Sequence, residues 1–217
     1  MKRSLDAIVQ ADQARYLEAL ERPRDSLLQE MEKDARVRDL PISDPEVASF
    51  LAVTARGCAP RLIVELGTNI GYGAIVLARA AGPSARVLTV EHSASLCATA
   101  RAYIERAGLA AQIEVREGKA LEVLAAIAGG IDLAYVDCVK EEYPRYLELL
   151  VPRLSDHGVI VADNVLWRGH VARGEVPASE QVRTAILREF NDAIVKHPSL
   201  RAVVLPLGDG VAYAVKT

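Results

Sequence analysis

The N-terminal region and the rest of the chain follow two different patterns of apolar and polar positions. Over residues 5–37, apolar residues recur at helical spacing among Glu and Arg, and Pro23 divides this stretch into two predicted helices. Asp44 followed by Pro45 predicts a further helix start, with Asp44 as the N-cap and Pro45 at the first helical position. We therefore expect an N-terminal helical cap over residues 1–40, followed by the main body of the protein.

The main body alternates short apolar runs, rich in β-branched residues, with longer segments of helical composition. Apolar runs without a polar face are typical of parallel strands that helices cover on both sides. The predicted strands in this part are 61–66, 86–90, 113–116, 131–136 and 158–162. The predicted helices between them are 72–81, 95–107, 121–128 and 143–154.

The C-terminal segment predicts an antiparallel ending to this sheet. A helix over 180–196 leads into two short apolar runs, 202–205 and 211–215, and the sequence LGDG between them is typical of a hairpin turn. We therefore predict an α/β fold with a doubly wound, mostly parallel sheet and a C-terminal antiparallel hairpin. The 217 residues suit one core, so we expect a single domain over residues 1–217.

Charge and residue composition exclude some functions but say little about the fold. The formal net charge is −3 and no long basic stretch occurs, which gives no reason to expect nucleic acid as a partner. Charges interrupt the N-terminal region, which has no signal-peptide or membrane-spanning pattern, so we expect a cytoplasmic protein. The 3 cysteines lack C-x-x-C spacing and the 4 histidines lack paired ligand spacing, which argues against disulfides or a zinc site. Any metal ion should therefore be held by oxygen.

The loop after the first predicted strand indicates a cofactor that contains an amino acid. In a doubly wound sheet, ligands bind at the carboxyl ends of the strands. The sequence ELGTNIG over residues 65–71 places Gly67 and Gly71 where the backbone can pass close to a ligand. Its spacing matches neither the dinucleotide fingerprint nor the P-loop, and the Glu65 carboxylate would repel a pyrophosphate but attract an ammonium group. A turn that binds nothing is the alternative.

An acidic residue also ends the second predicted strand. Glu91 lies 91 − 65 = 26 positions after Glu65, and an acid at this place can accept both hydroxyl protons of a ribose. After the third strand, backbone amides of Gly118 or Ala120 can contact an adenine. Together these strand ends describe a nucleoside joined to an amino acid, which is S-adenosylmethionine.

The fourth and fifth predicted strands end in residues that suit a hard metal ion. Asp137 follows the fourth strand, and Asp163 and Asn164 follow the fifth. Two carboxylates and an amide favour Mg²⁺, with Mn²⁺ or Ca²⁺ as alternatives, and leave roughly three places on an octahedral ion for water and substrate. The alternative is that these residues only end a strand and cap a loop.

Four segments in the same order resemble a known family. The longest is IDLAYVDCVKEEYPRYLELLVPRLSDHGVIVADNVLWRGHV, and VELGTNIGYGA, REGKALEVL and LPLGDGVAYAV support it. From about Pro41 to the end, the chain resembles the class I, cation-dependent O-methyltransferases of the caffeoyl-CoA and catechol O-methyltransferase group. The resemblance implies a seven-stranded, Rossmann-like sheet, S-adenosylmethionine and a divalent cation as cofactors, and frequent homodimers in the bacterial and plant branches.

The resemblance also implies roles for individual residues. Lys140 would be the general base that takes the proton from the acceptor hydroxyl, and Trp167 would wall the acceptor pocket. The metal ligands would be Asp137, Asp163 and Asn164. The residues that it implies around the cofactor are Ser43, Glu65, Gly67, Gly71, Tyr72, Glu91, Ala120 and Asp137.

Several positions depart from the family pattern and bear on the acceptor more than on the reaction. The common run Asp-Ala-Asp-Lys is Asp-Cys-Val-Lys here, over residues 137–140. Gly73 replaces a frequent serine, Lys119 often has Asp as its counterpart, and Arg168 often has Asn.

We therefore expect an enzyme that transfers a methyl group from S-adenosylmethionine to a hydroxyl of a small, catechol-like acceptor. Two vicinal oxygens would fill open places on the cation. Lys140 can act as base only if its pKa falls from about 10.4, and a solvated lysine at a helix start is the alternative. Three other functions stay open here: a cation-independent methyltransferase of the same fold, an NAD-dependent oxidoreductase, and a non-catalytic S-adenosylmethionine-binding protein.

Overall fold

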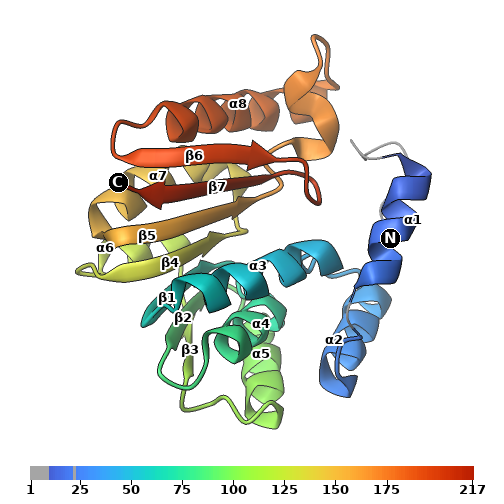
Figure 1. Ribbon diagram of the computed structural model, residues 1–217, viewed down its shortest axis with the longest axis vertical. Coiled ribbons are helices and arrows are strands. Elements are labelled where there is room, and N and C mark those ends of the chain that lie inside the picture. Colours follow the sequence, from blue (N-terminus) through green and yellow to red (C-terminus); the bar gives the residue numbers. More distant parts are fainter. Residues whose placement is uncertain (1–9, 22) are drawn as a thin grey trace.

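A seven-stranded sheet forms the centre of the computed structural model, which describes residues 10–21 and 23–217 (Figure 1). The strand order is β3-β2-β1-β4-β5-β7-β6. Strands β1 to β5 pair in parallel, and β7 pairs antiparallel with both β5 and β6. The strands are β1 (Leu62–Leu66), β2 (Arg86–Glu91), β3 (Ile113–Glu117), β4 (Ile131–Val136), β5 (Leu154–Asp163), β6 (Leu200–Leu205) and β7 (Val211–Lys216). This arrangement confirms the predicted α/β fold and its C-terminal antiparallel hairpin.

Two apolar clusters lie on opposite faces of the sheet. Successive strand residues point to opposite faces, so Ile63 belongs to one cluster and Val64 to the other. Helices α2 to α5 contribute to the first cluster, and α6 to α8 contribute to the second. The helices are α1 (Ala11–Leu20), α2 (Ser26–Val37), α3 (Pro45–Cys58), α4 (Tyr72–Ala81), α5 (Ala94–Arg106), α6 (Ala120–Ala125), α7 (Tyr143–Leu150) and α8 (Gln181–Lys196). The strands therefore read as apolar runs because both faces are covered.

The two N-terminal helices differ in how they attach to this core. Helix α2 buries Leu28, Met31 and Ala35 in the first cluster, whereas no residue of α1 is buried. Figure 1 shows α1 projecting away from the sheet. The predicted helices on either side of Pro23 are both present, and the part of that prediction over residues 5–9 lies outside the described residues.

Differences from the predicted boundaries are small and have local causes. Strand β5 begins at Leu154, before the predicted start at 158, because residues 155–157 are polar and do not have the apolar pattern of a buried strand. The pairing of β4 with β5 shifts register in this part. Helix α6 ends at Ala125 rather than at 128, and the Arg153 guanidinium donates to the carbonyl oxygen of Ala125 at 3.0 Å. Asp44 precedes α3 as predicted, although its side chain makes no capping hydrogen bond.

The strand order places a crevice where the site was predicted. Strands β2 and β3 lie on one side of β1, and β4 and β5 lie on the other, so the order reverses between β1 and β4. Ligands bind outside the carboxyl ends of the strands at such a reversal. Among the described residues, no helix is both long and apolar enough to cross a membrane.

Candidate functional site

A cleft of about 710 Å³ opens at the carboxyl ends of β1, β2, β4 and β5. The predicted site residues that line it are Ser43, Glu65, Gly67, Tyr72, Glu91, Asp137, Lys140, Asn164 and Trp167. The other three predicted residues, Gly71, Ala120 and Asp163, are not part of its lining. A second hollow of about 590 Å³ lies beside the edge strand β3 and contains none of the predicted residues. The first cleft is therefore the candidate site.

The Glu65 carboxylate lies in a polar row that crosses three adjacent strands. Glu65 pairs in register with Thr89 of β2 and with Tyr135 of β4. The Thr89 hydroxyl donates to Glu65 Oε2 at 2.5 Å. Burial raises the pKa of Glu65 to about 8, and the negative charges of Asp137 and Glu91 add to this rise. A cationic group placed beside Glu65 would relieve this cost.

Two glycines after β1 lie where a Cβ atom would collide with a neighbouring group. A Cβ on Gly67, whose φ is +103°, would lie 2.1 Å from the carbonyl oxygen of Asp137, so only glycine lets the loop after β1 cross the end of β4. A Cβ on Gly73 would lie 2.2 Å from Glu65 Oε1. The Glu65 carboxylate therefore occupies the space that a serine at position 73 would need. Gly71, with φ +89°, is the N-cap of α4.

Backbone amides fix the Glu91 carboxylate at the end of β2. The N–H of Asn69 donates to Glu91 Oε2 at 3.0 Å, and the N–H of Ser93 donates to Oε1 at 2.9 Å. Glu91 is 8% exposed and lines the cleft. Oε1 also lies 3.1 Å from His92 Nδ1, so Oε2 is the oxygen with a lone pair left for a ligand.

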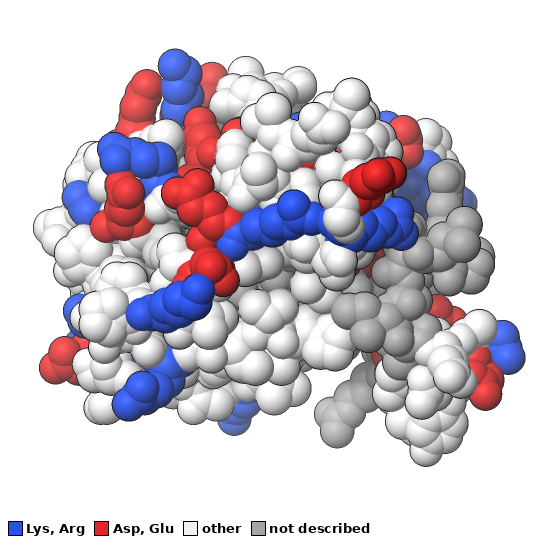
Figure 2. Space-filling view, turned by 90° about the horizontal axis from the view of Figure 1, so that it is seen from above, with Lys and Arg blue, Asp and Glu red and all other residues white. Residues whose placement is uncertain are grey.

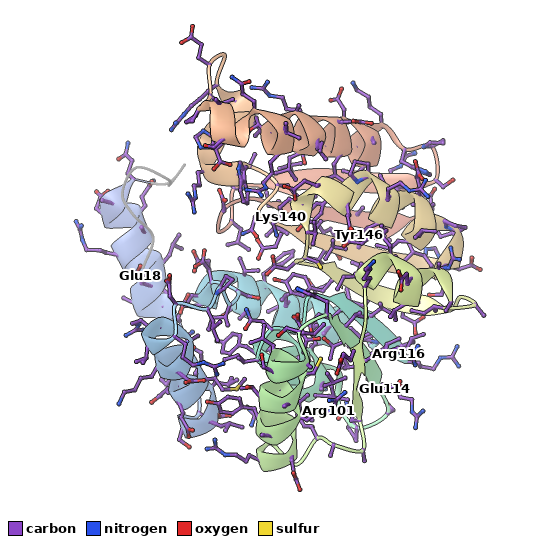
Figure 3. All side chains as sticks on the ribbon, turned by 180° about the vertical axis from the view of Figure 1, so that it is seen from behind. Glu18, Arg101, Glu114, Arg116, Lys140 and Tyr146 are labelled. Atoms are coloured by element: carbon purple, nitrogen blue, oxygen red, sulfur yellow. The ribbon has the colours of Figure 1, made fainter. Side chains whose placement is uncertain are left out.

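Lys140 is buried and ion-paired rather than solvated. Its Nζ donates to Asp137 Oδ1 at 2.7 Å and to the Tyr143 hydroxyl at 2.9 Å, and Figure 3 shows it just beyond the end of β4. Burial by itself lowers the pKa of Lys140, but its interactions with Tyr143 and Asp137 outweigh burial and raise the pKa above its ordinary value. In this state Lys140 is an ammonium group that compensates the charge of Asp137. The alternative of a solvated lysine at a helix start is wrong, because Lys140 is buried.

Asp163 lies buried behind the cleft, with one hydrogen bond to each oxygen. Its Oδ2 accepts from the Tyr135 hydroxyl at 3.0 Å, and its Oδ1 accepts from the N–H of Asn164 at 2.7 Å. The Tyr135 hydroxyl also lies 2.8 Å from Ser43 Oγ. Burial raises the pKa of Asp163, and the negative charge of Asp137 raises it further. Within the described ranges, no three His, Cys, Asp or Glu side chains form a metal-binding group, so the predicted set depends on the Asn164 amide.

Trp167 forms one wall of the cleft, and its partners come from the segment before α8, from α8 and from the next residue. Its indole Nε1 donates to Glu180 Oε2 at 2.7 Å. The guanidinium carbons of Arg183 and Arg168 lie 4.9 Å and 5.9 Å from its ring centroid. Asn164, Trp167 and Arg168 all have positive φ, a backbone conformation that non-glycine residues seldom adopt and that is often found at functional sites.

The sequence did not single out Thr89, Tyr135, Tyr143 or Arg183, although all four contact predicted site residues. A partial signal exists for Tyr135, because residues two apart in a strand share a face and Asp137 directly follows β4. Arg183 has no such signal, since it reaches the cleft from α8. Acidic and basic residues are interspersed on the face drawn in Figure 2, which shows no large area of one sign.

Comparisons with known proteins agree with this geometry. The family model described as O-methyltransferase matches residues 10–217. A catechol O-methyltransferase from Niastella koreensis is 35% identical over 79% of this chain and 80% of its own length, and a caffeoyl-CoA O-methyltransferase from Mesembryanthemum crystallinum is 30% identical over 80% and 72%. The crystal structure of an O-methyltransferase from Bacillus cereus in complex with S-adenosylhomocysteine is 31% identical, with a TM-score of 0.84 over 94% of this chain and 96% of that one. The chain therefore belongs to the O-methyltransferase family and is an S-adenosylmethionine-dependent O-methyltransferase, as its resemblance predicted.

Proposed function

We propose that this enzyme methylates a hydroxyl of a small, catechol-like acceptor and that a divalent cation, Mg²⁺ first, assists the transfer. The observation that carries the proposal is one cleft whose lining combines Glu65 and Glu91 with Asp137 and Asn164. The first pair suits an amino acid and a ribose, and the second pair suits a hard cation. Relatives named catechol and caffeoyl-CoA O-methyltransferase support the acceptor class.

The residues at the ends of β1 and β2 fit S-adenosylmethionine. Glu65 is buried with the Thr89 hydroxyl as its hydrogen-bond donor, so an ammonium group beside it would stabilise the ionised carboxylate. Glu91 is held by two backbone amides, and its Oε2 has a lone pair left for a ribose hydroxyl. We assign Gly67, Tyr72 and Ser43 to the walls around the cofactor. Gly71 and Ala120 do not line the cleft, and their predicted contacts, Ala120 on the adenine side, remain proposals.

The ends of β4 and β5 fit a divalent cation through the chemistry of their side chains. Asp137 and Asn164 line the cleft, and Asp163 lies behind it next to Asn164. The charge of Asp137 contributes to the raised pKa of Asp163, so negative charge is crowded here and a cation would relieve it. Carboxylate and amide oxygens are the ligands that Mg²⁺ accepts in proteins. We therefore assign Asp137, Asp163 and Asn164 as its ligands.

When bound, the cofactor supplies the methyl group and the cation supplies positive charge that favours an ionised acceptor oxygen. The protein supplies position: Trp167 orients an aromatic acceptor, and correct orientation of two reacting groups is worth roughly 7–11 kcal/mol. Lys140 would take the hydroxyl proton at Nζ after its ammonium group has released one proton to solvent. It becomes a base only when Asp137 shares its charge with another cation, because the Asp137 ion pair helps to keep Lys140 protonated.

The test is the release of S-adenosylhomocysteine from catechol or caffeic acid with Mg²⁺, and then with EDTA. We expect turnover that EDTA abolishes and that added Mg²⁺ restores. Turnover that is indifferent to EDTA would remove Asp137, Asp163 and Asn164 as metal ligands and favour the cation-independent alternative. If none of the acceptors in a wider panel gives S-adenosylhomocysteine release, the proposed acceptor class is wrong.

Two further expectations from the sequence remain predictions. A homodimer is expected from the family resemblance, and size-exclusion chromatography with light scattering would measure it against the 23.4 kDa chain mass. A cytoplasmic location is the second of these predictions.

A further inference from the structure

Arg168 differs from the other Lys and Arg side chains of the cleft. Lys140 pairs with Asp137 at 2.7 Å, and Arg183 pairs with Glu141 at 2.8 Å. In the part of the chain that the structure describes, no ion pair joins the Arg168 guanidinium to a carboxylate, and the residue is exposed at the rim of the cleft. Its charge is therefore available to a ligand without the loss of an existing ion pair.

The backbone holds Arg168 in a defined place while its side chain remains available. The N–H of Arg168 donates to Asp209 Oδ1 at 2.5 Å, and the N–H of the preceding residue, Trp167, donates to the carbonyl oxygen of Asn164 at 3.2 Å. The Arg168 guanidinium lies near the Trp167 ring. An aromatic acceptor placed against Trp167 would thus have a guanidinium beside it.

We propose that Arg168 determines specificity by binding a carboxylate on the acceptor, so that the preferred acceptors are catechol-like acids. The inference rests on the proposed function. A guanidinium presents two parallel N–H donors that match the two oxygens of a carboxylate, whereas a neutral or cationic side group gains nothing from it. The acids nearest this point are already engaged: Glu141 pairs with Arg183, Asp137 pairs with Lys140, and Asp209 accepts the backbone N–H of Arg168.

The experiment compares acids with their uncharged esters. S-adenosylhomocysteine release is measured with 3,4-dihydroxybenzoate and caffeate, and with the methyl ester of each, for the unmodified chain and for Arg168→Gln. The readout is the ratio of kcat/KM for acid to kcat/KM for ester, because a general loss of folding or chemistry cancels in this ratio. Arg173→Gln is the matched control, since it removes the same charge from the same loop and Arg173 does not line the cleft.

We expect the acid to be preferred by the unmodified chain, and we expect Arg168→Gln to lower the acid-to-ester ratio about 3- to 10-fold, as suits an ion pair at a solvent-exposed rim. Arg168→Glu should lower it further and turn the preference towards the cationic catechol dopamine. The Arg173→Gln ratio should stay unchanged. High salt should reduce the preference of the unmodified chain, because exposed charge pairs are screened.

An acid-to-ester ratio that is the same in the unmodified chain and in Arg168→Gln would overturn the proposal. A preference for caffeoyl-CoA over caffeate that Arg168→Gln removes would assign Arg168 to phosphate groups instead and overturn the carboxylate assignment. If no acceptor is methylated, the proposed function fails separately. The acid and ester are then compared as ligands by the fluorescence of Trp167, the chain's 1 tryptophan, and equal affinities would overturn the role of Arg168.

Discussion

The two halves of the cleft are built in different ways. In the half that we assign to the cofactor, formed by Glu65, Gly67 and Glu91, hydrogen bonds run between neighbouring strands and from the backbone amides of the adjoining loops. In the half that we assign to the acceptor, formed by the loop with Trp167 and Arg168, the partners come from outside the parallel strands: Glu180 precedes α8, and Asp209 lies in the turn between β6 and β7. The cofactor half is thus a consequence of the sheet itself, and the acceptor half is a loop that could change without altering the sheet.

This difference explains how one fold can keep a cofactor and vary its acceptor. Loops tolerate substitution better than buried strands, and specificity residues are therefore found on them. The departure at Arg168 lies in the acceptor half, whereas Gly73 lies in the cofactor half beside Glu65. Substitutions in one half should therefore leave the binding constants of the other half nearly unchanged.

Lys140→Ala should give the largest difference between an effect on turnover and an effect on cofactor binding. Turnover of catechol should fall about 100-fold or more, the range of a lost general base, while the Kd of S-adenosylmethionine changes little. Steady-state kinetics and calorimetric titration measure the two quantities. Lys196→Ala, at an exposed lysine that pairs with Asp192 and does not line the cleft, is the control and should change neither.

An acidic acceptor distinguishes a base from a structural ammonium group in that experiment. Nitrocatechol ionises without help, so it should recover much of the turnover that Lys140→Ala loses with catechol. Equal losses with both acceptors, or an equal loss of cofactor affinity, would contradict the base assignment and leave Lys140 as a structural partner of Asp137.

Gly67→Ala should disturb both halves together, because Gly67 lies in the loop that crosses the end of β4. The new Cβ would lie 2.1 Å from the Asp137 carbonyl oxygen, at a φ of +103°. Strain and overpacking should lower the free energy of unfolding by about 3 kcal/mol. Urea denaturation measures this, with Gly174→Ala as the control, since no atom lies within 4 Å of a Cβ at Gly174. An unchanged unfolding free energy would show that β1 and β4 can separate at this point.

Glu65→Gln tests whether the Glu65 carboxyl changes its charge when S-adenosylmethionine binds, and the measurement is the affinity as a function of pH. The pKa of Glu65 is about 8 in the structure instead of 4.5, so the carboxyl is largely protonated at neutral pH. An ammonium group beside it would lower this pKa, so binding of S-adenosylmethionine releases a proton. Affinity should therefore rise with pH up to about 8, by at most tenfold per pH unit. The ligand's own amino group titrates in both variants, so the difference between the unmodified chain and Glu65→Gln isolates Glu65.

The same shift makes a prediction for stability. A raised pKa in the folded state means that Glu65 supports the fold fully below pH 4.5 and that this support is lost as pH rises through about 8. Glu65→Gln should therefore gain stability relative to the unmodified chain over this range, by up to about 1.4 kcal/mol per pH unit. Urea denaturation at three pH values measures the gain, and a difference independent of pH would contradict the protonated carboxyl.

The residues at the strand ends of the cleft could be predicted from the sequence, whereas the contacts that hold them could not, for a physical reason. Strand ends can be recognised from local pattern, so Glu65, Glu91 and Asp137 were found from the sheet alone. The polar row of Thr89, Glu65 and Tyr135 depends on strand register, which no single strand reveals.

The acceptor half depends on contacts that local pattern does not encode. Trp167 is held by Glu180 from the segment before α8, and the loop is pinned by Asp209 from the hairpin turn. Trp167 and Arg168 have positive φ, which is uncommon for residues other than glycine, so the sequence pattern could not predict this conformation. The raised pKa of Lys140 has the same origin, because the Tyr143 hydroxyl that holds it belongs to the next helix.

Glu180→Ala gives the smallest expected effect and is confined to the acceptor half. It removes the acceptor of the Trp167 indole N–H, and a hydrogen bond to a charged group is worth about 1.5–3 kcal/mol at most, less at a partly exposed site. The KM of the acceptor should rise only a few-fold, and the Kd of S-adenosylmethionine should not change. The chain has 1 tryptophan, so its emission reports this wall alone and should shift when Glu180 is removed. Glu148→Ala, at an exposed pair with Arg145, is the control and should leave the emission unchanged. A loss of cofactor affinity in Glu180→Ala would show that the two halves are coupled through Trp167, and the separation between them would then be wrong.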